Sequence, residues 1–152
     1  ELVGILKSFH YITHMIHIHS KIEPDKLLHV VNRLSDIEGR TELIHENNFI
    51  QCATLKMEKD KTFPPHKHIT KDRHYSEQIA QESWVVIRGR VKCKFYDLDD
   101  ALIAEPILEA GDASFTLYGG HTYEILEDDT IVYEYKTGPY EGQNLDKTFI
   151  DD

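Results

Sequence analysis

The interpretation of this chain depends on Phe63-Pro64-Pro65-His66-Lys67-His68, followed after a gap by Glu82-Ser83-Trp84-Val85-Val86-Ile87-Arg88-Gly89. Side chains alternate between the two faces of a β-strand, so an H-x-H pair on a strand directs both imidazoles to one face. A carboxylate on a neighbouring strand, Glu82, can meet that pair. His121, which follows a glycine-rich turn at residues 118–120, can complete the set. The pattern predicts a metal site formed by three imidazoles and one carboxylate from separate strands.

From Thr41 onward the rest of the chain has the pattern of short strands. Apolar and β-branched runs recur at intervals of roughly ten residues between turn residues, which is typical of an all-β sandwich or barrel. The expected strands cover residues 49–55, 83–87, 91–96, 102–108, 114–117, 121–126 and 130–136. Pro106 cannot donate a backbone hydrogen bond, so the strand that contains it is predicted at a sheet edge.

The first forty residues are expected to contain a helix rather than strands. Pro24 suits the first turn of a helix over residues 24–35. Four apolar residues there repeat with helical spacing: Leu27, Val30, Val31 and Leu34. The sequence thus predicts an N-terminal arm and helix at residues 1–40, followed by one β domain at residues 41–150.

Residues 1–20 are rich in histidine and also have apolar residues at helical spacing. Three of the histidines fall together on another face: His10, His14 and His17. The segment is interpreted as an amphipathic arm or as an extension, and a second metal cluster is the alternative. The sequence leaves the role of the histidines at residues 10–19 open.

Composition limits the classes of partner. Among 152 residues, 27 are acidic and 17 are Lys or Arg, so the formal net charge is −10. This charge repels phosphate backbones and anionic lipids, so neither nucleic acid nor a membrane is an expected partner. Cys52 and Cys93 lack a C-x-x-C spacing and are interpreted as reduced thiols. The absence of a long apolar run and of signal-peptide features predicts a cytoplasmic location.

The two histidine-containing motifs resemble those of the cupin superfamily. Its first motif pairs H-x-H with a downstream Glu, six residues and a Gly, as Glu82 is here followed by six residues and Gly89. Its second motif starts with Gly and reaches His after a Gly-rich turn, as in Gly111-Asp112 and Gly119-Gly120-His121. The gap between His68 and Glu82 is longer than in the family motif, so residues 69–81 are interpreted as an inserted loop.

Within that superfamily, the chain is similar to small single-domain bacterial cupins associated with surface-polysaccharide and nucleotide-sugar pathways. The similarity covers residues 41–150 and includes the segments 81–82, 119–121 and 134–140. It implies a jelly-roll β-barrel, which is a double-stranded β-helix, with one divalent transition metal per chain. The implied ligands are His66, His68, Glu82 and His121. Imidazoles with one carboxylate suit Fe, Mn, Zn, Ni or Cu, and leave positions on the ion for water, substrate or oxygen.

Strand alternation also predicts what surrounds the metal. Trp84 shares the face of Glu82, and Tyr123 shares the face of His121, while Phe115 lies one strand earlier. Trp84, Phe115 and Tyr123 are the predicted substrate pocket, with plain core packing as the alternative for Trp84 and Tyr123. The phenol of Tyr123 is the candidate catalytic group, as a donor to a substrate oxygen or a weak acid.

The last expected strand alternates two charged residues with two tyrosines. Only one of the pairs Glu134/Lys136 and Tyr133/Tyr135 can face the barrel interior, and the sequence does not decide between them.

The functional hypothesis is a metal-dependent enzyme that isomerises or epimerises a small polar metabolite such as a sugar or nucleotide sugar. One alternative is an iron-dependent oxygenase, and another is a non-catalytic sugar-binding or regulatory module. A homodimer is the expected assembly, because exposed strand edges and an apolar N-terminal arm both favour pairing.

Overall fold

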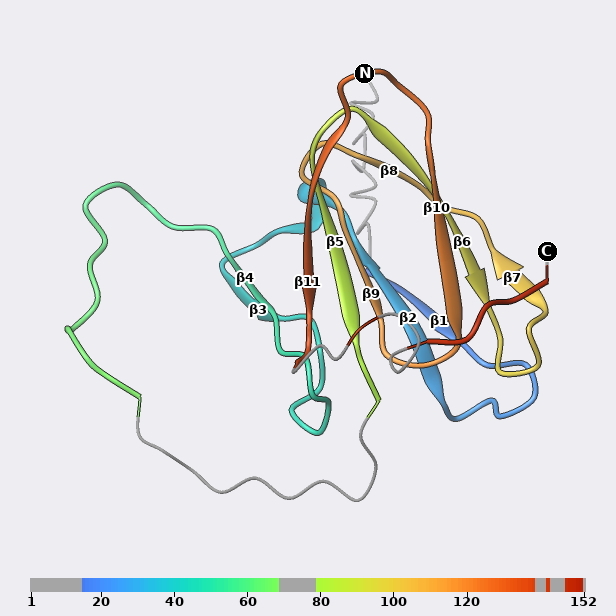
Figure 1. Cartoon of the computed structure of the whole chain (residues 1–152). Coiled ribbons are helices and arrows are strands. Elements are labelled where there is room, and N and C mark those ends of the chain that lie inside the picture. The colour runs from blue at the N-terminus through green and yellow to red at the C-terminus, as the bar shows by residue number, and fades with distance from the viewer. Residues whose placement is uncertain (1–14, 69–78, 139–141, 143–146, 152) are drawn as a thin grey trace, which may run out of the picture.

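The computed structural model describes residues 15–68, 79–138, 142 and 147–151. These residues form three antiparallel sheets (Figure 1). The five-stranded sheet has the order β1 (Ile16–His19), β2 (Leu27–Asn32), β9 (Ala113–Thr116), β5 (Glu82–Arg88) and β11 (Ile131–Lys136). The four-stranded sheet has the order β10 (Gly120–Ile125), β6 (Arg90–Tyr96) and β7 (Leu102–Ala104), and β8 (Ile107–Glu109) also pairs with β6. A two-stranded ribbon contains β3 (Arg40–Glu42) and β4 (Ala53–Leu55).

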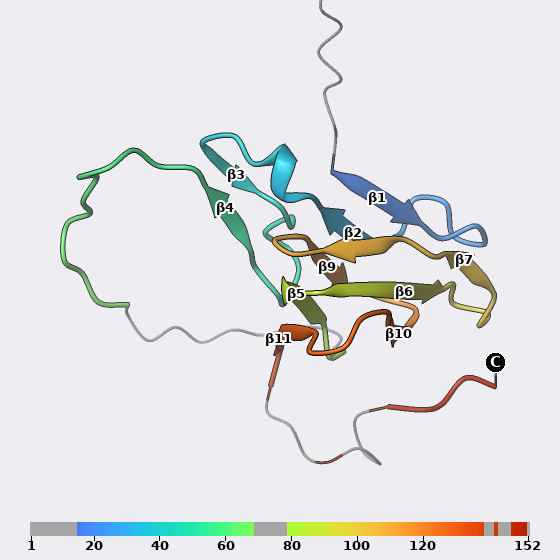
Figure 2. The same cartoon turned by 90° about the horizontal axis from the view of Figure 1, so that it is seen from above.

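The central strands β2 and β9 of the five-stranded sheet are covered on both faces. The inner face of this sheet meets the four-stranded sheet (Figures 1 and 2), and the core between them contains Val31, Val86, Val91, Cys93, Phe95 and Leu108. The outer core contains Val30, Ala113, Phe115 and Leu117 together with Leu43, Ile44 and Ile50. Cys93 in the inner core and Cys52 beside the outer core are both free thiols, as predicted.

The predicted helix over residues 24–35 is wrong. This stretch forms β2 and then a single 3-10 turn, η1 (Leu34–Asp36). Leu28, His29, Val30 and Val31 are each 0% exposed, because both faces of β2 are covered. An apolar run buried on both sides carries no period-two pattern, and its spacing is also compatible with a helix.

A bulge in β2 further obscures the period-two pattern expected of a strand. In the pairing of β1 with β2, one step along β1, from Ile18 to His19, corresponds to two steps along β2, from His29 to Leu27. The side chains of Leu28 and His29 both approach Gly119, where an added Cβ would lie 3.5 Å from Leu28 Cδ1 and 3.4 Å from His29 Nε2. Two successive side chains therefore point to the inner face, as a bulge allows.

β1 is an edge strand of the same sheet, so residues 16–32 are integrated with β9 and β5. The helical spacing predicted for residues 1–20 does not hold for β1, and residues 1–14 lie outside the described part of the chain.

Two other expected strands are shorter than predicted. The strand expected at residues 49–55 begins only at Ala53. The strand expected at residues 102–108 is divided at Glu105-Pro106 into β7 and β8. Both pieces pair with β6 at the edge of the four-stranded sheet, as predicted for a strand that contains Pro106. The described strands form an all-β fold of layered sheets but no closed barrel, so the jelly-roll barrel stays a prediction.

Two buried carboxylates connect the N-terminal strands to the hairpins of the β domain. Asp97 accepts hydrogen bonds from Ser20 Oγ at 2.5 Å and from the Lys21 amide at 2.6 Å. Burial raises the pKa of Asp97, but these hydrogen bonds outweigh it and hold that pKa below its usual value. Asp112 accepts a hydrogen bond from Arg33 at 2.7 Å. Both contacts join residues more than seventy positions apart.

The buried imidazole of His29 predicts a specific dependence of stability on pH. Burial lowers the pKa of His29 from 6.5 to about 4, because the charged form loses its solvation. The unfolded chain therefore binds a proton at His29 at a pH where the folded protein does not. The stabilisation of the neutral form is complete above pH 6.5 and is lost as the pH falls toward 4. The shift corresponds to about 3 kcal/mol.

We expect the free energy of unfolding, measured by urea denaturation between pH 4.5 and 7, to rise with pH by a large part of this amount. His29→Gln removes the titrating group and flattens the rise, whereas the same change at the exposed His45 leaves it in place. A wild-type profile that is flat over this range would contradict the burial of a neutral imidazole.

Candidate functional site

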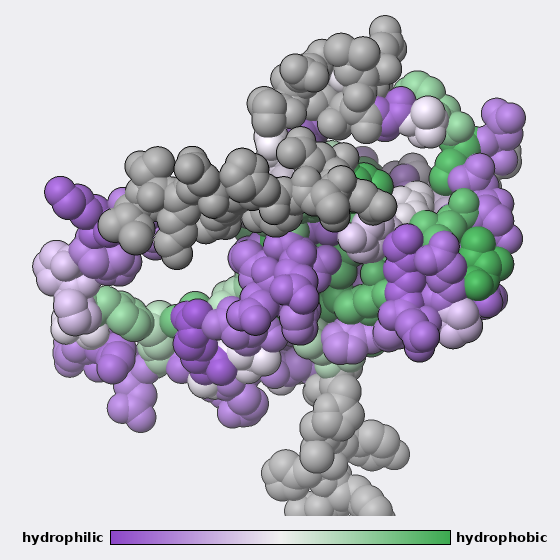
Figure 3. Space-filling view, turned by 90° about the horizontal axis from the view of Figure 1, so that it is seen from below, coloured by the Kyte–Doolittle hydropathy of each residue, from purple (hydrophilic) through white to green (hydrophobic). Residues whose placement is uncertain are grey.

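A row of polar residues crosses the inner face of the five-stranded sheet. In the register of the sheet, His29 lies opposite Thr116, Thr116 opposite Glu82, and Glu82 opposite Lys136. The row lies at the end of the sheets where β5 begins and β11 ends (Figure 1). From the facing sheet, β10 contributes His121. In the view from below, hydrophilic residues cover much of the described surface, with hydrophobic residues at several places among them (Figure 3).

Glu82 and His121 are brought together as predicted. His121 Nε2 lies 3.2 Å from Glu82 Oε1, and Trp84 Nε1 donates to the same oxygen at 3.1 Å. Burial raises the pKa of Glu82, but the hydrogen bonds from His121 and Trp84 and the charge of Lys136 outweigh it, so the pKa is lowered. Glu82 is therefore an ionised acceptor at neutral pH, with its side chain only 16% exposed.

Trp84 and Tyr123 stack on each other between the two sheets. Their ring centroids lie 3.9 Å apart at an interplanar angle of 13°, and both rings pack against the inner core. Each ring therefore covers one face of the other, and the pair fills the space between the sheets. The two rings leave no room for a ligand between them.

Burial also raises the pKa of Tyr123 above its usual value. The phenol remains protonated at neutral pH, so a phenolate base is excluded, whereas hydrogen-bond donation by the neutral group is not. The catalytic role of Tyr123 therefore stays a prediction only for the neutral phenol as a hydrogen-bond donor.

Phe115 is not brought together with Trp84 and Tyr123. It lies opposite Ser83 and Val30 in the register of the sheet, and therefore points to the outer face. There it packs in the outer core and is 2% exposed. The β5 residue that pairs with Phe115 is Ser83 rather than Trp84, and this one-residue difference in register sets the face.

His66 and His68 lie on an exposed irregular segment after β4, not on a strand, so the strand expected for the H-x-H pair is wrong. This segment extends away from the layered sheets (Figure 1). The two rings are near each other, with centroids 5.4 Å apart, and Pro64 O lies 3.0 Å from His66 Nδ1. Among the described residues, no three side chains of His, Cys, Asp or Glu are grouped closely enough to hold a metal ion. Glu82–His121 and His66–His68 are thus two separate pairs.

The Glu82–His121 pair nevertheless fits two neighbouring ligand positions. Ligand atoms at ~2.1 Å from an octahedral ion lie ~3 Å apart when they occupy adjacent positions. The 3.2 Å between Glu82 Oε1 and His121 Nε2 is close to that separation. His121 Nδ1 is buried and has no hydrogen-bond partner among the described residues, so no second contact there fixes the opposite side of the ring. The four-residue ligand set stays a prediction. The structure brings Glu82 and His121 together, and His66 and His68 lie apart from them.

The structure resolves which side chains of β11 point inward. Glu134 lies opposite Trp84 and Lys136 opposite Glu82, so both share the inner face. Tyr133 and Tyr135 point to the outer face and are each 58% exposed. Lys136 Nζ lies 3.9 Å from Glu134 Oε1.

Sequence reasoning missed His29 and Thr116 as members of the polar row, and it left open whether Lys136 faces inward. The sequence shows these residue types, but only strand pairing shows that they lie in line with Glu82.

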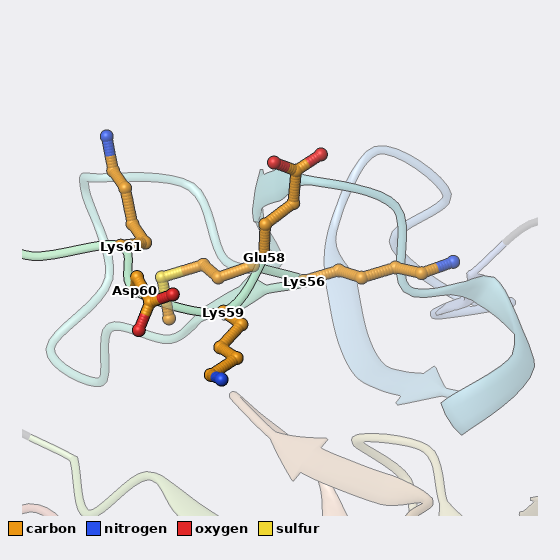
Figure 4. Close-up of a pocket in the computed structure, with 6 residues that line it drawn as sticks. Lys56, Glu58, Lys59, Asp60 and Lys61 are labelled. Carbon is orange, nitrogen blue, oxygen red and sulfur yellow. The ribbon is translucent and has the colours of Figure 1, made fainter.

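A separate surface depression is lined by Lys56, Met57, Glu58, Lys59, Asp60 and Lys61, after β4. Its charged side chains point in different directions rather than toward a common centre (Figure 4). This geometry does not define a ligand site.

The fold and the site together define an all-β protein of two layered sheets with a carboxylate–imidazole pair at one end. Comparisons with protein-family models, with curated proteins and with solved structures find no match. The resemblance to cupins therefore rests on the sequence motifs alone. In the described part of the chain, no helix is long and apolar enough to cross a membrane.

The turn before His121 predicts a large effect of a small substitution. Gly119 has a φ of +74°, and an added Cβ would overlap the backbone carbonyl oxygen of Tyr96. Gly39 also has a positive φ, +54°, but no described atom lies within 4 Å of its added Cβ. We expect Gly39→Ala to cost about 1 kcal/mol of unfolding free energy for the backbone conformation alone. Gly119→Ala should cost clearly more, because a backbone atom cannot move aside as a side chain can.

Thermal or urea denaturation followed by the fluorescence of Trp84, the one tryptophan of the chain, measures both losses. Equal losses at the two glycines would contradict the close approach of Gly119 to Tyr96.

Proposed function

We propose that this protein binds one divalent transition metal and acts on a small polar metabolite such as a sugar or nucleotide sugar. The proposed ligands are Glu82 and His121, joined by His66 and His68. One observation carries the proposal: two ligand-type side chains, from strands of opposite sheets, lie 3.2 Å apart at one end of the sheets. A cytoplasmic location and a homodimer, both predicted from the sequence, belong to the same proposal.

The surroundings of the pair support a reactive site rather than a structural one. The donor set contains imidazole and carboxylate but no thiolate, unlike the usual structural zinc sites. A bound metal would act as a Lewis acid on a neighbouring hydroxyl and carbonyl, which is the chemistry an isomerase or epimerase requires. Glu82 remains ionised and is oriented by Trp84 Nε1. Lys136 adds a positive charge on the same face.

The position of the site supports a small substrate. The stacked rings of Trp84 and Tyr123 fill the space on the core side of Glu82, so in this proposal the substrate meets the pair at the end of the sheets. Polar groups at that end suit a ligand rich in hydroxyl groups. In this proposal the second pair, His66 and His68, moves toward this end when the metal binds, because it is not grouped with Glu82 and His121 in the described structure.

Metal binding tests the first part of the proposal. We expect isothermal titration calorimetry with Mn(II), Ni(II) and Zn(II) to give one site per chain. Glu82→Gln and His121→Phe should each weaken binding by roughly a hundredfold or more, since each removes a ligand. His45→Ala is the matched control, because it removes an exposed imidazole outside the site.

A wild-type protein that binds none of these ions, or a His45→Ala loss equal to that of His121→Phe, would refute the site. The double variant His66→Ala/His68→Ala decides the composition of the ligand set. Weaker binding places these residues in the site, and unchanged binding restricts it to Glu82 and His121.

Turnover tests the second part. We expect the metal-loaded protein to convert one member of a nucleotide-sugar panel, followed by NMR, and Glu82→Gln to abolish the conversion. Oxygen uptake after anaerobic reconstitution with Fe(II) would instead indicate an oxygenase. Binding without turnover across the panel would indicate a non-catalytic module.

A further inference from the structure

The strand β11 forms one edge of the five-stranded sheet. It pairs with β5 on one side, and in the described part of the chain no strand lies on its other side (Figure 1). The register of the pair with β5 shifts only between Ile131 and Val132, so the pairing is regular from Tyr133 to Lys136. A regular strand edge of this kind is a template on which a strand of another molecule can pair.

The outer face of β11 is apolar and exposed. Tyr133 and Tyr135 are each 58% exposed, and Ile87 on the neighbouring strand β5 is 46% exposed. On the same face of the central strands, Val30 and Phe115 are 0% and 2% exposed, because the outer core covers them. Exposed aromatic side chains next to one another are typical of the central part of a protein–protein interface.

The backbone of β11 shows which residues a new strand would meet. The amide of Thr137 donates to the carbonyl oxygen of Gln81 at 3.0 Å, on the side of β5. In an antiparallel pair, successive residues direct their backbone groups to alternate sides of the strand. The backbone groups of Tyr135 are therefore directed toward β5 as well, whereas those of Glu134 and Lys136 are directed toward the opposite edge.

The side chains of these two residues carry opposite charges. Both are on the inner face, where the side chain of Glu134 is 44% exposed and that of Lys136 is 25% exposed. A two-fold axis perpendicular to the sheet and through Tyr135 would place Glu134 of each copy opposite Lys136 of the other. The backbone groups that face the edge then belong to the same residues as the complementary charges. An axis through Glu134 or through Lys136 would instead place like charges opposite each other.

We propose that β11 pairs antiparallel with β11 of a second copy around an axis through Tyr135, so that two five-stranded sheets become one continuous sheet. This inference rests on the homodimer of the proposed function and specifies its surface, and it does not depend on the metal site. The tyrosines of both copies meet on the outer face. One strand per chain is a small interface, so we expect a dissociation constant of about 1–10 μM.

The test exchanges the charges between the two residues and measures self-association by analytical ultracentrifugation. Glu134→Lys and Lys136→Glu each place like charges opposite each other twice, and each should weaken self-association by about tenfold or more. An equimolar mixture of the two variants should associate as the wild type does, because opposite charges then meet across the axis. Within each chain the contact of Lys136 Nζ with Glu134 Oε1 at 3.9 Å stays broken in both variants, so the mixture reports only the contact between chains.

Two further variants complete the test. Ile16→Lys is the matched control, because Ile16 is 41% exposed on β1, the other edge of the same sheet, and its substitution should leave association unchanged. Tyr135→Asp introduces a charge at the axis on the exposed outer face, away from Glu82, and should dissociate the dimer even if a charge exchange on the inner face prevents folding.

Each outcome decides a different point. A mixture of the charge variants that stays as weakly associated as either variant alone would overturn the inference, as would loss of the dimer in Ile16→Lys but not in Glu134→Lys. A wild type that is monomeric up to ~100 μM would refute this pairing and the homodimer together. A dimer that Glu134→Lys and Tyr135→Asp both leave intact would refute only the β11 surface.

Discussion

The arrangement depends on the burial of the central strands of the five-stranded sheet on both faces. An inner core and an outer core cover these strands, so their polar side chains lose water and are stabilised by partners inside the protein, although the buried hydroxyl of Ser83 has none among the described residues. His29 and Thr116 satisfy each other across β2 and β9, and Glu82 accepts from Trp84 and His121. The polar row at the end of the sheet is thus a consequence of this constraint. The side chains that it orients include Glu82 and His29, which can act as acids, bases or metal ligands.

The same constraint explains which parts of the fold the sequence could predict. The strands β5, β6, β9, β10 and β11 were found within a residue or two, because turn residues bound each of them. The strand β2 was predicted as a helix because its residues are buried on both sides and a bulge puts Leu28 and His29 on one face. Local spacing cannot distinguish that pattern from a helix, and only pairing with β9 does so.

The candidate site likewise contains residues that the sequence could place and residues that it could not. Glu82, Trp84, His121 and Tyr123 were correctly grouped because they are related by alternation along two strands. Phe115 was placed on the wrong side of the sheet relative to Trp84, His29 was missed and the direction of Lys136 was left open, because each depends on register between strands. The H-x-H pair was expected to face one way by the same alternation, but that argument requires a strand, and residues 61–68 form none.

The Glu82–His121 pair is held mainly from the side of the core. Glu82 accepts from Trp84, Trp84 stacks on Tyr123, and the hydroxyl of Tyr123 contacts that of Ser114. These contacts all lie on one side of the carboxylate, toward the core. On the other side, His121 Nδ1 lacks a partner in the described part of the chain, and the H-x-H segment is exposed. A metal that joined this pair to His66 and His68, as proposed, would therefore meet a pre-oriented carboxylate, and part of its binding free energy would go into bringing the two pairs together.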